Sequence, residues 1–169
     1  MSGKRIGAIG ALLIVSFFLS LVAMLTPSWM VLYWDNKWSS NQGIVPFSGH
    51  QPAWLVICSL LMYISFTLFF PLIAIFSFAF YKSHSSSRHI TRRLFQAIFA
   101  LSLLISIILL VIFTVFAVKA LSPPQEYVRR ATTAAAGYSA YLALGASLLT
   151  SFATMISGDV ICRSGSELE

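Results

Sequence analysis

Charged residues are scarce in this sequence, and their scarcity excludes a water-soluble domain. Only 9% of the 169 residues are charged, whereas a soluble domain carries about 25%. So little charge cannot cover a surface that faces water, so lipid must cover much of the protein. The hydrophobic fraction of 58% and the mean hydropathy of +0.85 agree with this conclusion. A single domain, residues 1–169, is expected at this length.

Cysteine is nearly absent as well. The two cysteines are Cys58, in the second long apolar run, and Cys162, at the end of the fourth. We expect them near opposite faces of a membrane, too far apart for a disulfide. Because no Cys and His spacing typical of a metal site occurs either, we expect no bound metal.

Ionisable residues are missing from the apolar runs. The first three runs contain no acid, lysine, arginine or histidine between their borders, and the fourth contains only Asp159. A transporter needs such groups inside the membrane, so a transport role would rest on Asp159 alone. The sequence also offers no nucleophile–base pair, no paired carboxylates and no phosphate-binding glycine loop. We therefore expect no enzyme activity, no catalytic residue and no cofactor.

The chain instead has four long apolar runs. With helical geometry, about 20 residues cross the hydrocarbon core, and the runs predict spans at approximately 6–26, 53–80, 94–118 and 134–161. For the first run a cleaved signal peptide is the alternative, but the run is longer than usual and no small-x-small site follows it. The sequence thus predicts an all-α membrane protein, an antiparallel, left-handed bundle of four transmembrane helices.

The basic residues indicate the orientation of this bundle. Four spans place both termini on one side, together with the loop 81–93 and the tail 162–169. Seven basic residues lie on that side and four lie with the loops 27–52 and 119–133, which favours cytoplasmic termini and two outer loops. The seven are Lys4, Arg5, Lys82, Arg88, Arg92, Arg93 and Arg163. Since the net charge of +6 lies beside apolar runs, it indicates lipid headgroups as partners and not nucleic acid.

The fourth run carries small residues at alternating steps of three and four. This period is typical of a helix that packs tightly against others, so we expect this helix at the centre of the bundle. The predicted packing seam consists of Ala136, Ala140, Ala143, Ser147, Thr150, Thr154 and Gly158. Near its end, Asp159 is expected to pair with Arg163, four residues further on, at headgroup level.

All four tryptophans lie between residues 25 and 54, in and beside the first outer loop. Trp29 and Trp54 border this loop, and we interpret them as anchors at the membrane interface.

Cys162 lies beside the membrane on the cytoplasmic side, where it is either a palmitoylation site or an unmodified thiol.

Several of these features together resemble the claudin superfamily, which includes claudins, epithelial and peripheral myelin membrane proteins and calcium-channel gamma subunits. They are the four spans, Trp29 after the first of them, the motif Gly43-Ile44-Val45, a short second outer loop, and the run Ala-Gly-Tyr-Ser-Ala-Tyr-Leu-Ala at 136–143. The resemblance covers nearly the whole chain.

The first outer loop departs from the family pattern of a tryptophan, then Gly-Leu-Trp, then two cysteines. Val45 replaces the second tryptophan, both cysteines are absent and the loop is about half the usual length. We expect a reduced extracellular β-hairpin or short sheet without a disulfide. Its strands would be residues 30–34 and 43–47, joined by a turn-rich segment.

The resemblance implies a plasma-membrane protein with a structural or adhesive role at cell–cell contacts, and it makes the cell junction a candidate location. Homo- or hetero-oligomers with related four-span proteins would follow. The alternative is an auxiliary subunit that modulates a membrane channel or receptor. Under this resemblance, the family motif or an interaction with a partner would be carried by Trp29, Gly43, Ile44 and Val45.

Overall fold

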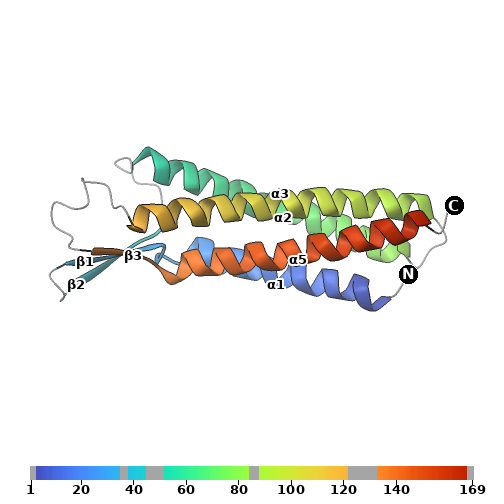
Figure 1. The fold of residues 1–169 in the computed structure, drawn as a ribbon, viewed down its shortest axis with the longest axis horizontal. Helices are drawn as coiled ribbons and strands as arrows, with labels where there is room; N and C mark the ends of the chain where they lie inside the picture. Colours follow the sequence, from blue (N-terminus) through green and yellow to red (C-terminus); the bar gives the residue numbers. More distant parts are fainter. Residues whose placement is uncertain (1–2, 35–37, 45–51, 84–87, 122–132, 167–169) are drawn as a thin grey trace.

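The computed structural model describes residues 3–34, 38–44, 52–83, 88–121 and 133–166. Four long helices run side by side (Figure 1): α1 Gly3–Leu25, α2 Ala53–Ser83, α3 Arg88–Leu121 and α5 Tyr138–Ser166. Each is long and apolar enough to cross a membrane, where a helix satisfies its own backbone hydrogen bonds. The chain is a multi-pass membrane protein. Both termini lie at one end, the terminal end, and a small sheet lies at the other, the sheet end.

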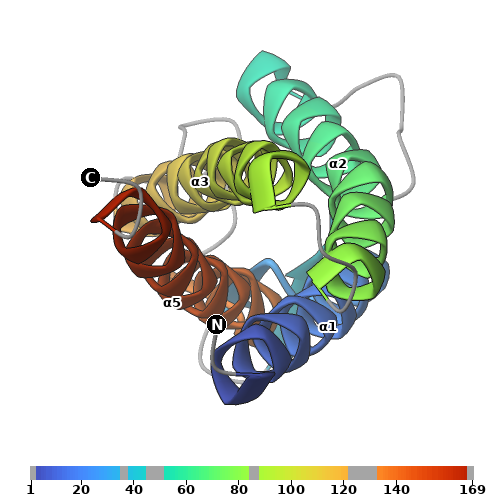
Figure 2. The same ribbon diagram turned by 90° about the vertical axis from the view of Figure 1, so that its right-hand side faces the viewer.

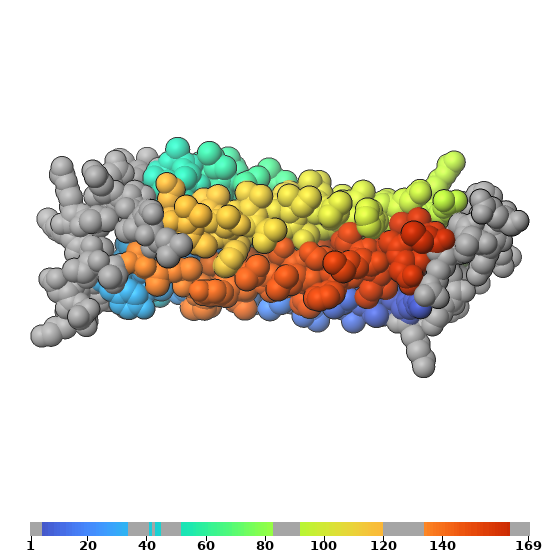
Figure 3. Space-filling model, in the orientation of Figure 1, coloured from blue at the N-terminus to red at the C-terminus, as the bar shows by residue number. Residues whose placement is uncertain are grey.

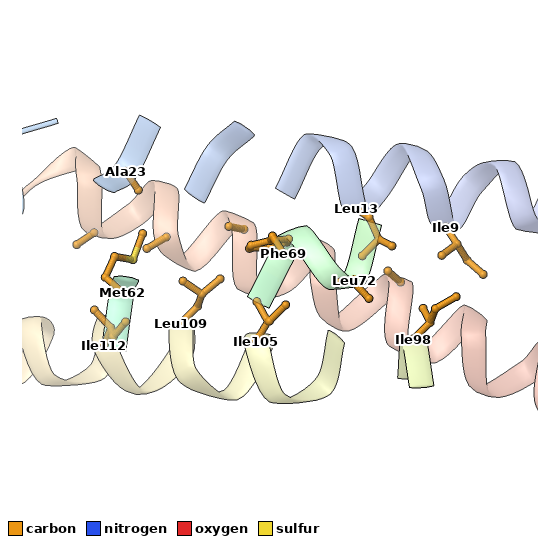
Figure 4. Close-up of a cluster of buried hydrophobic side chains, with 14 of the residues drawn as sticks. Ile9, Leu13, Ala23, Met62, Phe69, Leu72, Ile98, Ile105, Leu109 and Ile112 are labelled. Carbon is orange, nitrogen blue, oxygen red and sulfur yellow. The ribbon is translucent and has the colours of Figure 1, made fainter. Parts of the chain in front are cut away.

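The helices surround a common apolar core. Viewed along the bundle (Figure 2), α5 lies between α1 and α3, and α2 lies on the other side of α3. The middle of the bundle is filled by buried aliphatic and aromatic side chains (Figure 4). These include Ile9 and Leu13 of α1, Met62, Phe69 and Leu72 of α2, and Ile98, Ile105, Leu109 and Ile112 of α3. Large apolar side chains also cover the outside, as expected for surfaces that face lipid.

Helix α5 packs closely against both of its neighbours, as its small residues allow. Figure 3 shows α3 and α5 pressed together along their length. Ala140, Ala143, Ser147 and Thr154 are buried, and a Cβ on Gly158 would lie 3.4 Å from the ring of Phe99. Such close approach is typical of small residues at membrane helix interfaces.

Hydroxyl groups join α5 to its neighbours at several levels. Ser147 Oγ donates to the Ser106 carbonyl of α3 at 3.0 Å, and Thr154 Oγ1 donates to Ser102 Oγ at 2.8 Å. On the α1 side, Ser16 Oγ donates to the Ala146 carbonyl at 2.8 Å. These hydrogen bonds therefore hold α5 between α1 and α3, and they satisfy the buried hydroxyls that make them.

The sheet has three antiparallel strands in the order β2-β1-β3: β1 Met30–Trp34, β2 Trp38–Gln42 and β3 Thr133–Ala136. A short sheet and β1 are confirmed, but Gly43 and Ile44, predicted to open the second strand, are not part of one, and the remaining residues 45–47 lie outside the described residues. The strand lies at Trp38–Gln42 instead, with Met30 opposite Gln42 and Trp34 opposite Trp38. The polar sequence Trp-Ser-Ser-Asn-Gln indicates a turn when read alone, yet it pairs along the full length of β1.

The third strand also corrects the expected start of the fourth helix. Ala136, predicted as a helical seam residue, belongs to β3 and lies opposite Met30. Alanine favours helices, but pairing with β1 outweighs this preference here. Helix α5 begins only at Tyr138.

Candidate functional site at the sheet end

Trp29 lies where the chain leaves α1 for β1. Its side chain is fully buried, and its indole Nε1 donates a hydrogen bond to the Ala23 carbonyl at 2.7 Å. Its ring packs against Phe116 of α3, with the ring centres 4.9 Å apart. An interface anchor would expose its ring to headgroups, so that interpretation of Trp29 is wrong. Its burial, its hydrogen bond to Ala23 and its apolar neighbours make it a core residue.

Trp54, in the first turn of α2, shares the Phe116 ring. The rings of Trp54 and Phe116 meet edge to face with their centres 5.4 Å apart, a favourable geometry for aromatic pairs. Trp29, Trp54 and Phe116 thus form an aromatic cluster that joins the end of α1, the start of α2 and the end of α3. Trp54 is half-buried, and its role as an interface anchor stays a prediction.

The motif at residues 43–45 is tied to α2. Ile44 is fully buried in the helix core, and its carbonyl accepts a hydrogen bond from Ser59 Oγ at 2.9 Å. Gly43 is half-buried, and Val45 lies outside the described residues. The burial of Ile44 explains why an aliphatic residue stands here, because its side chain replaces solvent between the sheet and the helices.

Gly137 is a key residue that sequence reasoning missed. It stands between β3 and α5, and its N–H donates to the Trp29 carbonyl at 2.9 Å. Next to it, the Ser139 N–H donates to the Ser28 carbonyl at 3.0 Å. A Cβ on Gly137 would lie 2.6 Å from the Ser28 carbonyl carbon and nearer still to its oxygen. Only glycine allows this approach, and its place inside an alanine-rich run was the available signal.

The side chains of the sheet divide between two faces. Met30 and Leu32 are buried against Trp54 and Ala134. On the opposite face, Val31 lies between Asn41 and Ala135, and directly paired residues share a face. Tyr33, two residues along, joins them. We call Val31, Tyr33, Asn41 and Ala135 the outer sheet face.

The outer sheet face is open and uncharged. Tyr33 is 42% exposed, and Asn41 and Ala135 are exposed as well. Asn41 Nδ2 donates to Ser28 Oγ at 2.9 Å, which fixes β2 to the junction after α1. None of the three strand sequences contains an acid, lysine, arginine or histidine. The three strands themselves therefore offer apolar and hydrogen-bonded contacts and carry no charge.

At the terminal end, Asp159 of α5 forms an ion pair with Arg5 of α1. The predicted partner Arg163 has a side chain outside the described set. Cys162 is exposed on the last turns of α5, as a lipid-modified cysteine would have to be. Among the described residues, no group of three His, Cys, Asp or Glu side chains is placed to hold a metal ion.

Comparison with known proteins agrees with this architecture. A search of curated proteins finds no significant match. The family model described as "Tight junction protein, Claudin-like" matches residues 1–166. That match covers all four helices and all three strands, so the chain belongs to the claudin-like tight junction protein family.

Proposed function

We propose that this protein acts at cell–cell contacts of the plasma membrane, with its sheet end outside the cell. The termini and the loop 81–93 would lie in the cytoplasm, as the excess of basic residues on that side favours. The match to a family described by its tight junction proteins supports this role. Neighbouring four-span proteins of the same kind are the proposed partners.

The observation that carries this proposal is the fixed presentation of the outer sheet face. Strand β1 continues from α1, and β3 leads directly into α5, so the sheet is attached to two spanning helices. The hydrogen bonds of Gly137 and Ser139 lock these two connections together. A surface held this way loses little conformational freedom when a partner binds, which favours contact.

The buried motif residues have a positioning role in this scheme. Trp29 and Ile44 cannot touch a partner directly, because both are fully buried. They hold the sheet in place, and Val31, Tyr33, Asn41 and Ala135 make the contact. Cys162, near the cytoplasmic surface, is the proposed site of palmitoylation. An acyl-exchange assay should label the wild type but not Cys162→Ser.

The proposal is tested by placing a charge on the outer sheet face. Ala135→Arg puts a cation on an exposed position of β3, where it would meet the same face of an opposing copy. We expect the variant to reach the plasma membrane but to lose enrichment at borders between two expressing cells. Tyr81→Arg is the matched control, because Tyr81 is 74% exposed at the terminal end.

Two outcomes would contradict adhesion through contact between copies of this chain. One is equal enrichment of Ala135→Arg and wild type at shared borders. The other is enrichment of the wild type at borders with non-expressing cells, which no contact between copies explains. Recovery of a channel protein in fixed ratio from mild detergent, without border enrichment, would favour the auxiliary-subunit role instead.

A further inference from the structure

Positive charge gathers at the terminal end, where the described residues include a single acid. The described cations there are Arg5, Lys82, Arg92 and Arg93, and Asp159 is the one acidic side chain in the described part of the chain. Arg5 already pairs with Asp159. Within the described residues, Lys82, Arg92 and Arg93 therefore have no acid to neutralise them, although all three lie where α2 ends and α3 begins.

The first turns of α3 arrange these donors at the membrane surface. Arg92 is half-buried, and its Nε–H is shut off from solvent without an acceptor among the described residues. Arg93 and Gln96 are both exposed and lie three residues apart, so they share a face of the helix. The helix begins at Arg88, and its N-terminal dipole adds partial positive charge nearby.

This polar face continues directly into the lipid-facing side of α3. Steps of four and three residues lead from Gln96 to Ala100, Leu103 and Ile107, all exposed. Leu103 and Ile107 are 42% and 50% exposed, as residues beside acyl chains would be. Helices α2 and α3 are neighbours in the bundle, as the view from the terminal end shows (Figure 2).

We propose that Lys82, Arg92, Arg93 and Gln96 bind the headgroup of an anionic phospholipid in the adjacent leaflet. The phosphate would accept from the terminal guanidinium N–H groups of Arg92 and Arg93, while the acyl chains lie along Leu103 and Ile107. A soluble anion would gain nothing from that apolar stripe, which is why a lipid fits better. The site is independent of the adhesive role, because it lies at the opposite end of the molecule.

The test is a titration of the purified full chain with phosphatidylserine in detergent, followed by native mass spectrometry, with phosphatidylcholine as the neutral lipid. Each cation near an anionic headgroup contributes about fivefold to binding. We expect Arg92→Gln and Arg93→Gln each to weaken phosphatidylserine binding by about fivefold and to leave phosphatidylcholine binding unchanged. Lys119→Gln, which removes one cation from the sheet end, is the matched control and should change binding less than twofold.

Equal weakening by Lys119→Gln would overturn the site, since it would indicate a response to total charge. Unchanged binding in both arginine variants would overturn it as well. Displacement of phosphatidylserine by inorganic phosphate at equal concentration would show a soluble anion site in place of a lipid site. Arg92→Lys and Arg93→Lys keep the charge and should retain binding within about twofold, and the exposed Arg93 carries the test if Arg92→Gln fails to fold.

Discussion

Replacing Gly137 by alanine should separate the connection between α1 and β1 from the connection between β3 and α5. The new Cβ would lie 2.6 Å from the Ser28 carbonyl carbon, a backbone atom that no side-chain rotation can move aside. Overpacking of this kind costs about 1–3 kcal/mol. Moving Ser28 away also weakens two hydrogen bonds, Gly137 to Trp29 and Ser139 to Ser28, at about 1 kcal/mol each. We expect a loss of about 3–5 kcal/mol in the free energy of unfolding.

Gly7→Ala provides the matched control, because no atom lies within 4 Å of a Cβ at Gly7. Alanine favours the helix by about 1 kcal/mol over glycine, so this variant should be as stable as wild type or slightly more. Unfolding is followed by tryptophan fluorescence in mixed micelles, and Trp29 and Trp54 both report on the sheet end. The reasoning fails if Gly137→Ala unfolds at the same denaturant concentration as wild type.

Further substitutions test the aromatic cluster and the ion pair. Trp29→Ala removes a fully buried ring and should lower the free energy of unfolding by about 3–5 kcal/mol. Trp29→Phe keeps the contact with the Phe116 ring but loses the hydrogen bond to the Ala23 carbonyl. It should lower the free energy of unfolding by about 1–2 kcal/mol. Equal losses in both would show that the ring contact is unimportant. Asp159→Asn should cost less than about 1 kcal/mol, because Arg5 and Asp159 are 38% and 45% exposed. A loss clearly above about 1 kcal/mol in unfolding titrations would contradict this weak surface pair.

The helices could be predicted from the sequence because membrane solvation imposes one rule on every span. A long apolar run must satisfy its backbone internally, so its length alone indicates a helix. The close packing of α5 against α1 and α3 followed similarly from small residues such as Ala143 and Ser147. Local composition was sufficient wherever lipid set the requirement.

Outside the spans, local composition was a poor guide because long-range contacts decide. The polar strand β2 and the alanine strand β3 have no strand-like pattern of their own, and each forms by pairing with β1. Trp29 was placed at the interface because its sequence position borders a span. Its burial depends on Phe116, which lies 87 positions further along the chain and gives no signal near Trp29.

The continuity of β1 with α1 and of β3 with α5 has a mechanical consequence. A tension applied to the sheet along the bundle axis reaches both helices at their sheet-side ends together, since Gly137 and Ser139 couple the two junctions. Both helices are then pulled in the same direction, so the α1–α5 interface is not sheared. The load is therefore shared by α1 and α5 along their common interface, where buried contacts such as Ser16 with Ala146 join the two helices.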